Sequence, residues 1–190
     1  ASTNVSESKS TVFDSSSNKI VVSYGNTSSS TIGTSVVGTI SGTNISFGTP
    51  AAFNATAVAN VKAAFDNNSN KVVVFYQDSG NSSKGTSVVG TVSGTGISFG
   101  TAAVFDSKET GLITSTFDSN LNKIVVFYRE LVGSTYAATC VVGTVSGTGI
   151  SFGTPVVIQA NSIYRPTGTF DSSSNKIVVS YHSNGTAAVG

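Results

Sequence analysis

The chain has 190 residues, of which only 10% are charged, and ten Lys and Arg residues against nine Asp and Glu leave a net charge of +1. So little positive charge does not suit a polyanion, and we expect no nucleic-acid partner. The sequence holds no apolar run long enough for membrane insertion, and its single cysteine, Cys140, excludes an internal disulfide and a cysteine metal cluster. The hydrophobic content of 38% is rich in Val and Ile, which favours a β-structured core.

A repeat of about 52 residues runs through the whole chain. A Phe-Asp pair returns in four places, each time followed by Asn-Lys, a Val/Ile run and Tyr, as in FDSSSNKIVVSY. These pairs are Phe13-Asp14, Phe65-Asp66, Phe117-Asp118 and Phe170-Asp171. A second block, SVVGTISGTNISFGT, returns twice with few changes. The repeat predicts a single repeat domain with units at about 1–53, 54–105, 106–158 and 159–190, the last of them truncated.

Each unit is predicted to contain four short β-strands, which we call A, B, C and D in chain order. Strand A ends at Phe-Asp and covers residues 10–14, 61–66, 113–118 and 166–171. Strand B follows, at 18–24, 70–76, 122–128 and 175–181. Strand C covers 34–40, 86–92, 139–145 and a shortened 186–190, and strand D covers 45–53, 97–105 and 150–158. No segment has the apolar period of a helix, so we expect an all-β fold.

The two middle copies of strand B are apolar on both faces, because Phe75 and Phe127 stand where the outer units have Ser. A strand with two apolar faces belongs to a sheet that is packed between two others. Four strands in about 52 residues is the spacing of a β-propeller blade, and we therefore predict a β-propeller of four-stranded antiparallel blades. A β-solenoid and a chain of small sandwiches are the alternatives, although solenoid coils are usually shorter and the unit is too short for a sandwich.

The fourth unit lacks strand D, since the sequence stops where the other units continue into it. Three explanations are open: a three-stranded blade, a strand supplied by a neighbouring chain, or a piece of a longer array. An array cut within a unit leaves an open sheet edge, which natural proteins avoid, so we favour the last explanation.

Variation between the units is concentrated at one end of the predicted blades. Antiparallel order places the A–B and C–D turns, which are nearly identical in all units, at one end and the B–C and D–A connections at the other. The B–C loops (25–32, 77–84, 129–136, 182–185) and the D–A segments (54–62, 106–112, 159–166) differ from unit to unit. Binding residues often lie on loops of a rigid scaffold, although turn chemistry and unconstrained drift explain part of the contrast.

Three repeated residues have both a structural and a functional interpretation. The Asp that ends strand A is expected to close the A–B turn by accepting backbone N–H groups, because one carboxylate per turn is too few for Ca²⁺. The Lys that starts strand B is expected to protect a strand margin rather than to bind an anion. The Tyr that ends strand B is expected to pack between blades with its hydroxyl at the rim, and stacking on a sugar is the alternative.

Residues outside the repeat pattern are better candidates for a ligand site, since the scaffold does not need them. In the variable segments these candidates are Asp78, Arg129, Glu130, Tyr136, Tyr164, Arg165 and His182. We expect no catalytic residue, no metal and no cofactor, because His182 is the only histidine and no GxSxG or phosphate-binding motif is present. An acid pair for glycoside hydrolysis, drawn from Asp78, Asp106 and Glu130, is a minor alternative.

The blocks VVGTVSGTGISFGT and FDSSSNKIVVSY resemble the tandem repeats of tail-fibre-like and adhesin-like proteins of marine phages and bacteria. They also resemble, more loosely, the blades of sialidase-type and lectin propellers. The resemblance implies a non-catalytic extracellular or virion-borne module that binds a cell-surface glycan or receptor through its variable face. The alternative is a structural spacer or assembly component of a fibre or surface layer, with self-association or neighbouring units of a parent chain at the open edge.

Overall fold

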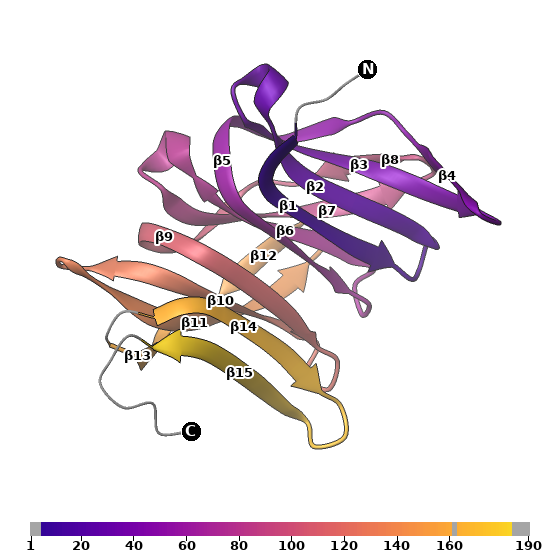
Figure 1. The fold of residues 1–190 in the computed structure, drawn as a ribbon. Coiled ribbons are helices and arrows are strands. Elements are labelled where there is room, and N and C mark those ends of the chain that lie inside the picture. The colour runs from indigo at the N-terminus through magenta and orange to yellow at the C-terminus, as the bar shows by residue number, and fades with distance from the viewer. Residues whose placement is uncertain (1–4, 161–162, 184–190) are drawn as a thin grey trace.

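The computed structural model describes residues 5–160 and 163–183, which form β-strands joined by tight turns (Figure 1). The first unit holds β1 (Val5–Asp14), β2 (Lys19–Asn26), the 3₁₀ turn η1 (Thr27–Ser29), β3 (Ile32–Ser41) and β4 (Asn44–Phe47). The second holds β5 (Ala51–Asp66), β6 (Lys71–Asp78), η2 (Ser79–Asn81), β7 (Lys84–Ser93) and β8 (Gly96–Phe99). The third holds β9 (Ala103–Asp118), β10 (Lys123–Val132), β11 (Thr135–Ser146), β12 (Gly149–Phe152) and β13 (Val156–Gln159), and the fourth holds β14 (Ile163–Asp171) and β15 (Lys176–Ser183).

The all-β prediction is confirmed for the described residues, in which every strand pair is antiparallel. In the same residues no helix is long and apolar enough to span a membrane. The predicted fourth copy of strand C, residues 186–190, lies outside the described residues, so the structure does not test how the last unit ends.

The A–B turns close as predicted. Asp14 Oδ1 accepts the backbone N–H groups of Ser16 at 2.9 Å and Ser17 at 3.1 Å. Asn18 then adopts a left-handed conformation with φ of 55°, which asparagine tolerates better than most residues. The same arrangement recurs at the other three turns, which begin at Asp66, Asp118 and Asp171. The repeated Asp and Asn are therefore turn-forming residues.

Strand D and the D–A segments differ from the prediction. Strand D is interrupted after β4, where Gly48 N–H donates to Val37 C=O at 2.9 Å, and Gly100 and Gly153 repeat this contact. The chain then continues as one 16-residue strand, β5, whose first part pairs with β3 and whose second part pairs with β6. Strand β9 does the same one unit later. The segments 54–62 and 106–112, expected to be D–A loops, are therefore parts of strands. Residues 54–62 contain no proline or glycine that would end a strand, and in the second segment the strand pairing continues on both sides of Gly111.

The units stack in chain order, from indigo to yellow in Figure 1. We call the side of a unit that faces the preceding unit its leading side, and the opposite one its trailing side. In β6, alternate residues serve the two sides: Val72, Val74 and Tyr76 join a core with the first unit, and Val73 and Phe75 join a core with the third. All five side chains are 0% exposed. The prediction of a sheet packed between two others is confirmed here.

The first strands of the units lie side by side along the stack. Strand β5 contacts β1 and β9, and β9 contacts β14. Hydrogen bonds join β1 to β5: Ser8 Oγ accepts Val61 N–H at 2.6 Å, and Ser10 Oγ accepts Ala63 N–H at 3.0 Å. The strand pairings of the described residues do not close into a ring, so the propeller stays a prediction.

Candidate functional site

The variable connections gather at one end of the molecule, as predicted, but they are more regular than expected. This end lies on the left of Figure 1, where the β10–β11 hairpin projects, and the Asp-to-Asn turns lie on the right. Asp78 ends β6, Arg129 and Glu130 lie within β10, and Tyr136 lies within β11. The turn between β10 and β11 is only Gly133-Ser134, with Gly133 at φ of 62°. These candidates were expected in loops and lie on strands, because the ladder continues outward to the tight turn.

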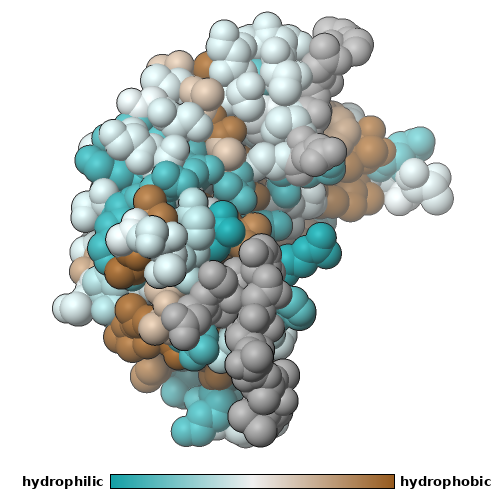
Figure 2. All heavy atoms as spheres, turned by 60° about the vertical axis from the view of Figure 1, so that its left-hand side comes forward, coloured by the Kyte–Doolittle hydropathy of each residue, from teal (hydrophilic) through white to brown (hydrophobic). Residues whose placement is uncertain are grey.

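The end that carries these connections faces the viewer in Figure 2 and is mostly polar, with apolar side chains in separate patches. A cavity of about 450 Å³ lies where the first strands of all four units meet. It is lined by Ser8, Lys9, Ala59, Asn60, Val61, Lys62, Leu112, Ile113, Arg165 and Pro166. We call it the central pocket. Such concave sites, built from several elements, are where ligands usually bind.

A repeated bulge shapes the central pocket. Asn60, Leu112 and Arg165 occupy equivalent positions and all have positive φ, at 52°, 49° and 51°. The strand pairing shifts its register next to each of them. Such bulges redirect side chains next to functional sites. The Asn60 side chain connects two bulges, since its Oδ1 accepts Leu112 N–H at 3.2 Å and its Nδ2 donates to Gln77 Oε1 at 2.9 Å.

Among the described side chains, those that line the central pocket carry positive charge only. Lys9, Lys62 and Arg165 are exposed around it, and no described carboxylate is among the lining residues. Three cations without a lining acid favour an anionic ligand in this pocket. Sequence reasoning named Arg165 but missed Lys9 and Lys62. A partial signal was available, because Lys62 interrupts the run of mostly small and apolar residues that leads to Phe65-Asp66.

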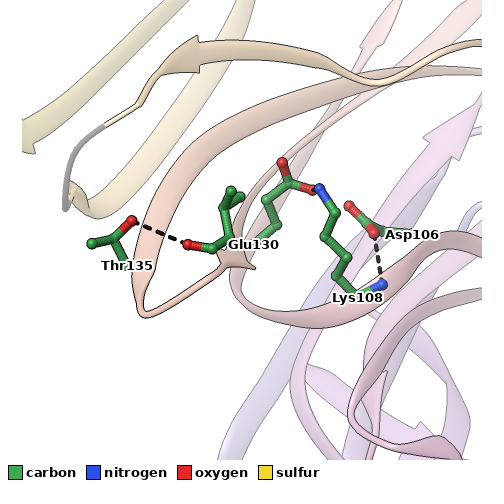
Figure 3. A network of polar contacts seen from close by, with 5 residues as sticks. Asp106, Lys108, Glu130 and Thr135 are labelled. Carbon is green, nitrogen blue, oxygen red and sulfur yellow. Dashed lines mark hydrogen bonds and ion pairs between the residues drawn. The ribbon is translucent and has the colours of Figure 1, made fainter.

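A second cavity, of about 500 Å³, is lined by an acidic pair at the variable end. Asp106 and Glu130 are 7% and 3% exposed, and Lys108 contacts both (Figure 3). The Lys108 backbone N–H donates to Asp106 Oδ1 at 2.8 Å, and its Nζ lies 3.1 Å from Glu130 Oε2. Asp106 Oδ2 is buried and accepts no hydrogen bond from the described residues.

The surroundings of the acidic pair raise the pKa of Glu130 and of a neighbouring tyrosine. Burial raises the pKa of Glu130 above 4.5, the adjacent Asp106 raises it further, and Lys108 opposes both. Burial also raises the pKa of Tyr128, and the negative charge of Asp106 adds to that effect. Glu130 therefore holds a proton at a higher pH than an ordinary glutamate does.

The same position in the preceding unit has a simpler polar cluster. There Asp78 Oδ1 accepts from Thr56 Oγ1 at 2.8 Å, from Asn54 Nδ2 at 3.2 Å and from Gly80 N–H at 3.1 Å. Asn54 and Asp78 stand 52 residues before Asp106 and Glu130, and this places both clusters at equivalent sites of the repeat. A repeated polar contact at a unit boundary indicates a structural role. Asp78 is not brought together with Asp106 and Glu130, so only the last two form the acid pair considered from the sequence.

The other candidates lie apart from the acidic pair. The Arg129 guanidinium lies 3.9 Å from the ring centroid of Tyr136, whose hydroxyl donates to Glu109 Oε1 at 3.2 Å. Tyr164 pairs with exposed His182 across β14 and β15, and its side chain lies outside the described part. Of the candidates whose side chains the structure describes, only Arg165 lines the central pocket.

The repeated lysines and tyrosines have structural contacts. Lys19 Nζ and Lys123 Nζ donate to Thr39 Oγ1 at 2.9 Å and Thr144 Oγ1 at 2.8 Å. Tyr76 and Tyr128 pack between units as predicted, against Phe53 and Phe105. Their hydroxyls do not reach the rim, because both residues are 0% exposed. Among the described residues no group of three His, Cys, Asp or Glu side chains is placed to hold a metal ion.

Comparison with known proteins identifies no relative: no protein-family model matches the sequence, and no curated protein matches it significantly.

Proposed function

We propose that the chain is a non-catalytic module that binds an acidic cell-surface glycan in the central pocket. The observation that carries the proposal is the convergence of Lys9, Lys62 and Arg165 on a cavity that no carboxylate of the described side chains lines. Asn60 and Ser8 add polar atoms to the same wall. A carboxylated or sulfated sugar supplies the negative charge and the hydroxyl groups that such a wall recognises.

The fold part of the proposal is that the units are blades of a β-propeller. It is supported by the side-by-side first strands and by their meeting at one pocket. Propellers bind ligands where the blades converge, which agrees with a site at the central pocket. Together with the resemblance of the repeats to tail-fibre-like and adhesin-like proteins, this favours a module on a virion or outside the cell.

The test is calorimetric titration with sialyllactose against lactose, which lacks the carboxylate. We expect saturable binding of the acidic sugar only, weakened by added salt. Lys62→Gln should reduce the affinity about fivefold, since an exposed ion pair contributes up to about 1 kcal/mol. Lys176→Gln is the matched control, because Lys176 is exposed at a turn on the opposite end. Equal binding of both sugars, or equal loss in both variants, contradicts the proposal.

The second candidate function is a structural spacer or assembly component. The observation that favours it is the exposure of large apolar side chains on the outer sides of the first and last units, including Phe47 at 55% and Val178 at 52%. A spacer binds none of the anionic sugars that the central pocket would take, so the titration separates the two functions.

A further inference from the structure

The leading side of the first unit exposes side chains that the second and third units bury or half-bury. Phe13, Ile40, Ile45 and Phe47 are 52%, 52%, 48% and 55% exposed. Their counterparts in the second unit are Phe65, Val92, Ile97 and Phe99, and all four join the core between the first two units. Ile97 is only 8% exposed, and its counterpart in the third unit, Ile150, is 9% exposed. The leading side of the first unit therefore has the apolar character of a surface that packs between units, but among the described residues no unit covers it.

The trailing side of the fourth unit shows the complementary exposure. Residues 170–181 have the same twelve-residue sequence as residues 13–24 of the first unit. In the first unit Val21 and Ser23 are 0% exposed, and Val21 belongs to the core shared with the second unit. In the fourth unit the counterpart of Val21, Val178, is 52% exposed, and Ser180 is exposed as well. The trailing side of the same hairpin sequence is thus buried in the first unit and exposed in the fourth.

We propose that these two sides bind each other between copies: the leading side of the first unit docks on the trailing side of the fourth unit of a second copy. The partner is a copy of this chain because the contact repeats what the molecule already makes between its units. Exposed apolar patches of this kind mark association surfaces. A head-to-tail contact of this type generates a ring if the rotation closes and a filament if it does not. The inference does not use the central pocket, but it means that units of two copies, and not the first and fourth units of one copy, would complete a ring of blades.

The test is sedimentation velocity of the 190-residue chain over a range of concentrations. We expect concentration-dependent association of the wild type, and loss of it in Ile45→Glu and in Val178→Glu. Leu121→Glu is the matched control, because Leu121 is 63% exposed in an A–B turn, away from both sides. Circular dichroism melting checks that each variant is folded, and Ile40→Lys replaces Ile45→Glu if that variant is not.

A mixing experiment identifies the geometry. Ile45→Glu blocks only the leading side and Val178→Glu only the trailing side, so a mixture of the two variants keeps one intact pair of surfaces. We expect this mixture to form dimers and nothing larger. A wild type that stays monomeric up to its solubility limit overturns the proposal. Association that survives Val178→Glu, or a mixture that forms no dimer, overturns the head-to-tail arrangement.

Discussion

Carboxyl groups at the two ends of the units differ in how their environment changes their pKa. Asp14 is held by its turn: burial acts to raise its pKa, but hydrogen bonds from Ser16 and Ser17 outweigh burial and lower the pKa below 3.8. Glu130 shows the reverse shift, because burial and Asp106 outweigh the attraction of Lys108. The two carboxyl groups therefore give stability opposite dependences on pH.

We predict that Glu130→Gln changes the pH dependence of stability. A group whose pKa is higher in the folded state contributes stability that is present below its unfolded pKa, near 4.5, and is lost as pH rises through the folded value. The free energy of unfolding of the wild type should therefore fall, relative to Glu130→Gln, as pH rises from 4.5. Urea unfolding of both proteins at about pH 4 and about pH 7 measures how the difference in their free energies of unfolding changes. A constant difference between the two proteins contradicts the prediction.

At the scale of elements, glycine permits the close approach of the long strands to their neighbours. The rings of Phe53 and Phe105 lie against Gly33 and Gly85, where β5 and β9 cross from one unit to the next. A Cβ at either glycine would clash with the ring. Phe53 in turn packs on Tyr76, and Phe105 packs on Tyr128. Each phenylalanine therefore contributes both to strand pairing and to the stacking of units.

We predict that Gly85→Ala destabilises the protein by about 1–3 kcal/mol, because the added methyl group displaces the Phe105 ring from a packed core. Gly96→Ala is the control: its nearest neighbour is Ser93 C=O at 3.7 Å, and the first unit has Asn44 at this position. Thermal and urea unfolding of both variants give the comparison. Equal stability of the two variants would show that the ring moves aside at no cost.

At the scale of the whole molecule, neighbours decide which copies of a repeated side chain are buried. Ile45 and Ile97 occupy the same position of the repeat, yet they are 48% and 8% exposed. Among the described residues, only Ile97 packs in a core shared with a preceding unit. The stability of such an array is a sum of unit terms and nearest-neighbour contacts.

We predict that Ile97→Ala lowers the free energy of unfolding by about 2–5 kcal/mol, as expected for a buried isoleucine. Ile45→Ala should cost less than about 1 kcal/mol, since its side chain is half exposed. Both variants are compared by urea unfolding at low protein concentration, where copies do not associate. Similar losses in the two variants would contradict nearest-neighbour stacking.

Much of the local structure follows from the sequence, because turns and strands depend on nearby residues. Asp14 and Asn18 specify their turn through side-chain acceptance and tolerance of positive φ, and the Val/Ile runs specify strand B. The two apolar faces around Phe75 also predict its burial between units.

Only the tertiary structure decided three other features. Residues 54–62 continue as strand because β3 and β6 offer ladders to successive parts of β5. Lys9, Lys62 and Arg165 meet in one pocket because bulges of separate units lie side by side. Glu130 is buried beside Asp106, whereas Arg129, its neighbour in sequence, lies against Tyr136. Local sequence patterns determine what a residue contributes to its own strand or turn, but the stacking of units that are far apart in the sequence determines which other residues it contacts.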